Sequence, residues 1–328
     1  MTMLATLIVA FSVVKFPGGP ATDLANAIWK ANRKNVVIEQ AIMTDLPPMQ
    51  FEANSVDQIS SAVKRDGNLR MLPGTEVIFS DSILPPASVP GCQVRGTATG
   101  AMFKGLNPQA LRNGLVTYRM LDNERFGLDS LQTINFSHPV KVNRLLRNYY
   151  LAVTVENMPE RDFLDYLARA CGGHLRTSGN TWTLEPNAAE FKRRLLNLWV
   201  LREKQEPNII KDAGNRLATL QTMRLIFDYA SPEYLVKALE NEDTGLNLSI
   251  PAGSDIHNRL TGFFASLDPG SGFPLIGGLV QTPTGPLTIL GSESFTATLH
   301  GDFTLDLSFP AVDEAGERKV AKVTLAAS

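Results

Sequence analysis

The sequence predicts an α+β protein built from tandem small modules, and two observations support this class. The first is an internal repeat: residues 68–78 (NLRMLPGTEVI) and residues 174–184 (HLRTSGNTWTL) share a Leu-Arg start, a glycine turn and a Thr. The second is that each of these hairpins follows a strand and then an amphipathic helix that ends at glycine. The repeated unit is therefore strand, helix, strand, strand.

The first module is expected over residues 8–81, in the order β-α-β-β-α-β-β. Pro20 suits the first turn of a helix, where its missing N–H is not needed, and Leu24, Ile28 and Ala31 then give that helix a buried stripe. The expected elements are strand FSVVKF, helix ATDLANAIWKANRKN, strands VVIEQ and MQFEAN, helix SVDQISSAVKRDG and the closing hairpin.

A second module is expected over residues 115–186. Its rear half is well defined by the strand YLAVTVEN, the helix MPERDFLDYLARACGG and the second hairpin, whereas residues 116–147 follow the pattern only loosely. Between the modules, residues 82–114 are rich in Pro, Gly, Ser and Thr, which is typical of a linker.

The character of the chain changes after residue 186. Residues 187–220 are predicted to form a helical connector with an apolar stripe and a basic remainder. A basic helix of this kind can bind a membrane surface or a partner, but a connector with a solvated face is favoured. Residues 221–268 are predicted to be a third, partial α+β unit, with TMRLIF as a strand and Ser-Pro-Glu as a helix start, and residues 269–328 an all-β segment.

Composition excludes several classes of protein. The 31 Lys+Arg and 33 Asp+Glu residues leave a net charge of −2, without the basic stripe that tracks phosphates, so no nucleic-acid partner is expected. Two cysteines, Cys92 and Cys171, exclude a disulfide-dense scaffold and leave one bridge open. The apolar run over residues 1–16 is shorter than the roughly 20 residues of a membrane helix. It is either a buried strand or the remnant of a signal peptide.

Catalytic and metal-binding patterns are not recognisable in the sequence. The histidines His138, His174, His257 and His300 are scattered, and the pair Cys171 and His174 is too small a motif to predict a metal site. We therefore expect no enzyme activity and no cofactor, although a pocket lined from several modules stays open.

Five side chains are candidates for contact with a partner. Tryptophans can stack on a partner surface, and arginines of an amphipathic helix can pair with its charges. The candidates are Trp29, Trp182, Trp199, Arg193 and Arg194, with the core of a small domain as the competing location for the tryptophans.

Residues 8–81, and less fully residues 148–186, resemble the secretin and TonB N-terminal short domain, also called the N0 domain. The resemblance rests on the Pro-initiated helix after a Pro/Gly turn, the glycine-terminated helix and the Leu-Arg hairpin. It implies periplasmic modules that pack into rings beneath an outer-membrane pore, or that relay a signal from a TonB-dependent transporter. The C-terminal β-segment of about fifty residues is too short for either membrane barrel, so pore activity is not implied.

From this resemblance we expect a non-enzymatic structural component of the bacterial cell envelope. Its secretin-like modules would self-associate into a ring or stacked array that serves protein transport, in the periplasm or outer envelope. Its partners would be copies of itself, and other envelope or secretion-system proteins. The alternatives are a signalling adaptor of the TonB-dependent type and a viral or filament structural protein.

Overall fold

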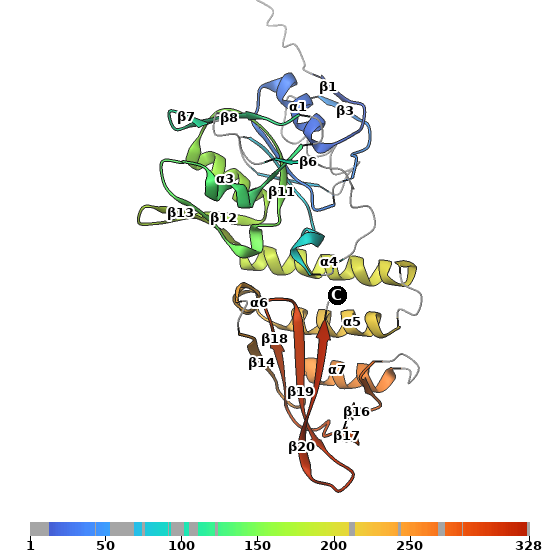
Figure 1. The fold of residues 1–328 in the computed structure, drawn as a ribbon. Helices are drawn as coiled ribbons and strands as arrows, with labels where there is room; N and C mark the ends of the chain where they lie inside the picture. Colours follow the sequence, from blue (N-terminus) through green and yellow to red (C-terminus); the bar gives the residue numbers. More distant parts are fainter. Residues whose placement is uncertain are drawn as a thin grey trace, which may run out of the picture. The chain divides into compact units, whose positions relative to one another are not determined.

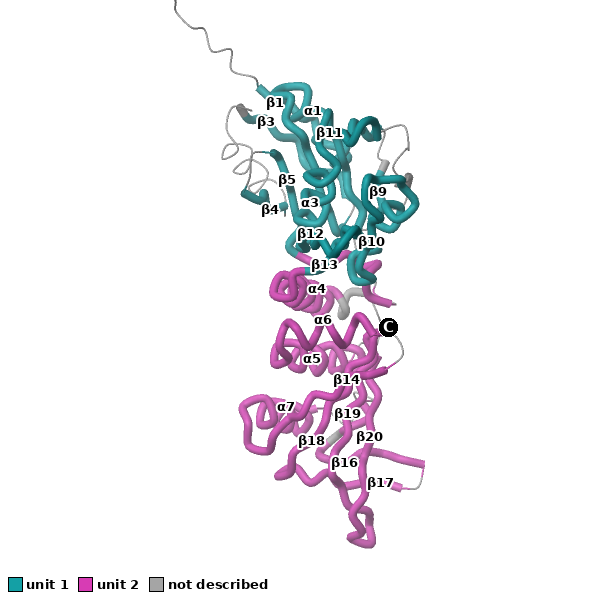
Figure 2. The backbone as a smooth tube through the Cα atoms, turned by 90° about the vertical axis from the view of Figure 1, so that its left-hand side faces the viewer, with its two compact units in different colours: residues 1–82, 96–186 teal, residues 83–95, 187–328 magenta. Residues whose placement is uncertain are grey.

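The computed structural model describes residues 13–42, 44–52, 69–73, 76–90, 92, 102–104, 111–121, 124–209, 214–241, 244–267, 273–283 and 285–326. The fold is α+β, as predicted (Figure 1). The chain divides into two compact units (Figure 2). Unit 1 comprises residues 1–82 and 96–186, and unit 2 comprises residues 83–95 and 187–328.

Unit 1 is organised around a mixed sheet whose strands come from distant parts of the chain. At its centre β2 (Val36–Glu39) pairs in parallel with β5 (Val77–Ser80) on one edge and antiparallel with β11 (Tyr150–Pro159) on the other. The remaining strands are β4 (Arg70–Leu72), β6 (Met102–Lys104), β7 (Leu111–Arg112), β8 (Leu115–Arg119) and β9 (Glu124–Gly127).

This sheet corrects the expected arrangement of separate modules over residues 8–81 and 115–186. Strands from both segments form one continuous sheet, and residues 82–114 contribute β6 and β7 rather than only a linker. The physical reason is that all four residues of β2 are buried, so both of its edges need hydrogen-bonding partners. Local sequence patterns do not reveal which distant strand supplies them.

Helix α1 (Ala21–Asn32) lies between this sheet and a smaller one. It contacts β2 and β11 and also β1 (Val13–Phe16), which pairs antiparallel with β3 (Met49–Glu52). The helix follows Pro20 and ends at Arg33, whose left-handed backbone (φ 57°) lets its N–H donate to the Trp29 carbonyl at 2.8 Å. The predicted helix SVDQISSAVKRDG lies outside the described residues.

The second hairpin is confirmed as β12 (Gly173–Ser178) and β13 (Thr181–Pro186), with β10 (Val140–Val142) parallel to β13. Two glycines connect α3 (Glu160–Ala170) to this hairpin, and each is needed for a different reason. Gly172 has a φ of 73°, whereas a Cβ on Gly173 would lie 2.4 Å from the Glu185 carbonyl oxygen. Between β9 and β11 the chain also forms the short 3₁₀ helices η3 (Leu128–Thr133) and η4 (Arg144–Leu146).

Unit 2 combines helices with an antiparallel sheet. Its helices are α4 (Ala188–Ile209), α5 (Gly214–Tyr229), α6 (Pro232–Glu240) and α7 (Asp255–Ser266). Its strands are β14 (Leu246–Ile250), β15 (Leu275–Ile276), β16 (Leu279–Thr282), β17 (Gly285–Ile289), β18 (Phe295–Leu299), β19 (Thr304–Val312) and β20 (Arg318–Ala326). No described helix is both long enough and apolar enough to cross a membrane.

Two predictions for this region have different outcomes. The helix start at Ser-Pro-Glu is confirmed, because the Ser231 side chain accepts a hydrogen bond from the Tyr234 N–H at the start of α6. The predicted strand TMRLIF is wrong, since it belongs to α5, where Met223, Ile226 and Phe227 form part of a buried helical face. A short apolar run fits both the two-residue period of a strand and the 3.6-residue period of a helix, and this run is helical in the structure.

Residues 83–95, which we name the strap, belong to unit 2 although they come between the two parts of unit 1. The strap contains the 3₁₀ helix η1 (Pro86–Ser88) and buries Leu84 and Val89. The Leu84 N–H donates to the Arg194 carbonyl of α4 at 3.3 Å.

Candidate functional site

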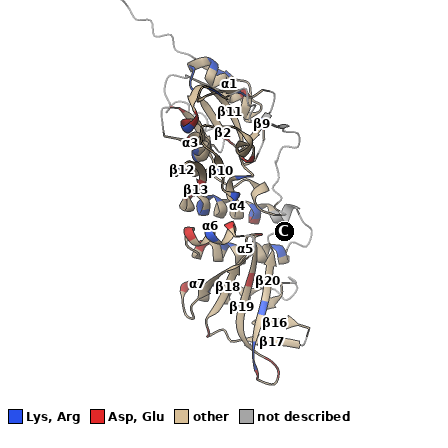
Figure 3. Ribbon diagram, turned by 60° about the vertical axis from the view of Figure 1, so that its left-hand side comes forward, with Lys and Arg blue, Asp and Glu red and all other residues tan. Residues whose placement is uncertain are grey.

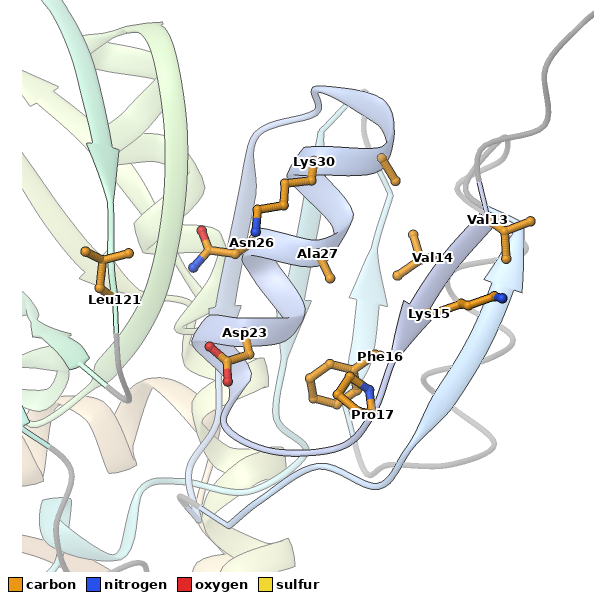
Figure 4. A pocket seen from close by; sticks show the side chains of 11 residues that line it. Val13, Val14, Lys15, Phe16, Pro17, Asp23, Asn26, Ala27, Lys30 and Leu121 are labelled. Atoms are coloured by element: carbon orange, nitrogen blue, oxygen red, sulfur yellow. The ribbon is translucent and has the colours of Figure 1, made fainter.

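A groove of about 690 Å³ crosses the exposed face of α1 in unit 1. Strand β1 borders it and Leu121 lies on the far side of the helix (Figure 4). We name it the α1 groove. Its lining residues come from β1, from the outward positions of α1 and from the segment that follows β8.

Strand β1 has one partner strand among the described residues, β3, with Val14 opposite Phe51 and Phe16 opposite Met49. Its other edge therefore keeps backbone N–H and C=O groups that no described strand pairs. The side chains alternate, so Val14 and Phe16 point into the core while Val13 and Lys15 are exposed.

The walls of the α1 groove combine exposed apolar side chains with small ones. Val13 is 43% exposed and Leu121 is 55% exposed. Ala27 and Ala31 of α1 are partly buried and line the same groove. An apolar ligand side chain would find both contact area and space here.

Two of the four polar side chains that line the groove are cationic. Lys15 and Lys30 line it and are exposed, and neither forms an ion pair with any described residue. Asp23 is the carboxylate among the lining residues. Asn26 is fixed, because its Nδ2 donates to the Met120 carbonyl at 2.9 Å and its Oδ1 accepts from Thr154 Oγ1 at 3.0 Å.

Next to Lys30, two arginines stack on the indole of Trp29. The guanidinium carbon of Arg33 lies 4.2 Å from a Trp29 ring centroid and that of Arg119 lies 3.8 Å from it. Trp29 itself is 7% exposed, while both arginines are exposed and have no carboxylate partner in the described part of the chain. Stacking on an indole restrains an arginine and leaves its N–H donors open to an anion.

The five predicted contact residues are distributed over both units. Trp29 belongs to the cationic cluster beside the groove, and Trp182 of β13 stacks on His138 with ring centroids 4.4 Å apart. In unit 2, Trp199 is buried against Phe227 and Phe303, and Arg194 is buried with its Nε 3.1 Å from Glu190. Neither of these last two side chains is accessible to a partner in this structure.

Arg193 is partly exposed, but its guanidinium already donates to both carboxylate oxygens of Glu190, at 2.9 and 2.6 Å. Lys192 is also used internally, because its Nζ donates to the carbonyls of Asp228 and Ala230 at the end of α5. The basic face that the sequence indicated on α4 therefore stabilises unit 2. Sequence reasoning missed Arg33, which directly follows α1. It also missed Arg119 and Leu121, whose proximity to α1 depends on the pairing of β8 with β11.

Outside the α1 groove, the titratable side chains of the described residues do not form a metal-binding cluster. Among the residues that the structure describes, no three His, Cys, Asp or Glu side chains are placed to hold a metal ion. Cys171 is buried and Cys92 is half-buried, and no disulfide joins them. Arg125 of β9 is 2% exposed; burial lowers its pKa to about 10, and the charges of Asp23 and Asp45 oppose that shift.

Comparisons with known proteins find a similarity to a ribosomal protein. No family model matches it, and no solved structure matches it. It is similar to the large ribosomal subunit protein bL9 of Cupriavidus taiwanensis, with 30% identity over 106 residues that cover 30% of this chain and 71% of that protein. The match defines a class, the proteins of the large ribosomal subunit. Through this stretch, the chain belongs to the bL9 family.

This finding corrects the functional expectation drawn from the sequence. A secretin-like ring component for protein transport in the cell envelope conflicts with similarity to a ribosomal protein. Ring formation and a secretin-type role are therefore withdrawn. The resemblance of residues 8–81 to the N0 domain is a separate statement about fold and stays a prediction.

Proposed function

We propose that this chain is a non-enzymatic structural protein that binds the large ribosomal subunit. The observation that carries the proposal is the similarity to bL9, which covers 71% of that protein. The exposed α1 groove supports a binding role, because it combines apolar side chains with a strand edge and cationic groups that no described residue pairs.

We propose contact with a protein of the particle rather than with its RNA, because the cations of the α1 groove share that surface with Asp23 and with apolar side chains. The net charge is −2, and Lys and Arg are interspersed with Asp and Glu along both units (Figure 3). Proteins that track phosphates present several unpaired basic side chains in a row. On α4 such side chains are engaged with Glu190 and with the end of α5.

We also propose that the beginning of the chain has an N0-like fold, without the pore-related function of that family. The order β1, α1, β2, β3, then β4 and β5 after residues 53–68, supports this proposal. In this chain α1 contacts both the two-stranded sheet and the larger sheet, and no described strand pairs with the other edge of β1.

Co-sedimentation tests the ribosomal assignment. The purified chain is mixed with isolated large or small ribosomal subunits and centrifuged through a cushion at low and at moderate salt. We expect the chain to pellet with large subunits and not with small ones, and to be displaced only weakly by salt. Failure to pellet with large subunits, or equal pelleting with both, overturns the assignment. Steep loss with salt overturns the protein contact in favour of phosphate binding.

A further inference from the structure

We infer that the α1 groove binds an extended peptide segment, which adds a strand to the open edge of β1 and carries carboxylates next to apolar side chains. This inference deepens the proposed function, because it names the chemistry of the partner. It rests on contacts within unit 1, so it can be tested with isolated peptides and without ribosomes.

The backbone of β1 supplies the first part of the argument. A sheet of two strands is only marginally stable, and β1–β3 has this size among the described residues. A third strand on the other edge of β1 would satisfy backbone groups that no described strand pairs. Such an addition binds any extended chain, so side chains must provide the selectivity.

The apolar contacts supply the second part. Alternate side chains of an added strand would face α1, where Ala27 and Ala31 leave room because they are small. Val13 of β1, which is 43% exposed, would pack beside the outward-facing side chains of such a strand and lose contact with water. Figure 4 shows Ala27 on the side of α1 that faces β1. Apolar residues at alternate positions of the peptide therefore fit the groove.

Charge complementarity supplies the third part. Lys15 and Lys30 line the groove, and Arg33 and Arg119 stack on Trp29, which precedes Lys30 in α1. Arginines restrained by stacking lose little freedom when they pair with a carboxylate through two hydrogen bonds. Phosphate would satisfy the same donors, but it would use neither the strand edge nor the apolar walls. An acidic peptide uses all three.

Calorimetric titration of the full chain tests the inference with synthetic peptides of alternating sequence. The probe is a short Val-Glu repeat, and the matched control is a Val-Lys repeat of equal length. A second control is the Val-Glu peptide with alternate backbone nitrogens methylated, which keeps the side chains but removes strand pairing. We expect the unmodified Val-Glu peptide to bind at least about tenfold more tightly than either control.

Variants locate the binding to the α1 groove. Arg119→Gln and Lys30→Gln should each weaken binding of the Val-Glu peptide by about tenfold. Arg161→Gln, an exposed arginine of α3, should leave the affinity unchanged. Thermal unfolding of each variant separates loss of binding from loss of fold, and Lys30→Gln retains both arginines on Trp29.

Four results would overturn the inference. Equal binding of the methylated peptide rejects strand addition, and equal binding of the Val-Lys peptide rejects the charge argument. Displacement of the peptide by an unstructured RNA such as polyuridylate assigns the groove to phosphate. Peptide binding only after removal of residues 1–12 assigns it to the chain's own segment. Co-sedimentation can fail while the peptide still binds, and the reverse is also possible, so the two proposals fail separately.

Discussion

Glu190 illustrates how single residues set the charge state of unit 2. It lies in the first turn of α4, where a carboxylate also favours the helix dipole. Burial raises the pKa of Glu190, but hydrogen bonds and positive charge from Arg193 and Arg194 outweigh that effect and lower the pKa from 4.5 to about 2. The ionised form is thus favoured in the folded chain.

We predict that Glu190→Gln destabilises unit 2 at neutral pH and not in strong acid. Because the folded pKa is depressed, the carboxylate contributes stability above about pH 4.5 and loses it as the pH falls toward 2. The side chain is partly exposed, so the loss should be on the order of 1 kcal/mol. Urea unfolding at neutral and acidic pH measures it.

The matched control for this prediction is Glu314→Gln, an exposed carboxylate in the turn between β19 and β20. It should unfold like the unmodified chain across the same pH range. A Glu190→Gln variant that is equally stable at pH 7, or whose deficit grows as the pH falls, would contradict the account of α4.

At the scale of the elements, β11 depends on one irregular position. Its pairing with β8 shifts register between Val155 and Met158, and Asn157 there has a φ of 52°. Its N–H donates to Thr117 Oγ1 at 3.0 Å. A β-bulge of this kind lets the strand bend while it stays paired on both sides.

We predict that Asn157→Gly is tolerated to within about 0.5 kcal/mol, because glycine adopts a positive φ without strain. Asn157→Val should cost about 1–2 kcal/mol, since a β-branched side chain clashes in the left-handed region. Chemical unfolding followed by circular dichroism compares the two variants. Equal stability of the glycine and valine variants would show that the backbone at position 157 is not the constraint.

The elements show which kinds of information the sequence contains. The hairpin β12–β13 and the start of α6 could be predicted because Gly179-Asn180 and Ser231-Pro232 are local signals. The strand assigned to TMRLIF failed because its apolar residues fit two periods. The pairing of β2 with β11 could not be predicted, since a buried strand has the same apolar sequence pattern whichever strand lies beside it.

The candidate site was less predictable than the fold. Trp29 could be singled out as a large aromatic residue on an amphipathic helix. Arg119 and Leu121 could not, because they reach α1 only through the non-local pairing of β8 with β11. The open edge of β1 is likewise a property of the assembled sheet, since a strand that has one partner looks the same in sequence as a strand that has two.

At the scale of the whole molecule, unit 2 relies on the strap. Leu84 is fully buried, and the backbone of the strap is hydrogen-bonded to α4. We predict that Leu84→Ala destabilises unit 2 by about 2–5 kcal/mol, the range for truncation of a buried leucine. Hydrogen exchange should then become faster in α4, while β11 in unit 1 keeps its protection.

Ala87→Ser is the matched control for the strap, because Ala87 is exposed within η1. It should leave the exchange rates of α4 unchanged. Unaltered exchange in the Leu84→Ala variant would mean that the strap lies on unit 2 without supporting it. Equal acceleration in β11 would mean that the two units do not unfold separately.

The route of the chain also bears on its synthesis. Residues 83–95 are translated before α4 exists, so the apolar side chains of Ile83, Leu84 and Val89 must stay in water while the intervening residues are added, roughly 5–20 each second. Unit 1 meanwhile lacks β11, the strand on which β2 pairs. Neither unit can complete its core until a later part of the chain has been synthesised. A nascent chain that stalls in this interval would expose both unfinished cores at once, which makes this stretch of translation its most aggregation-prone period.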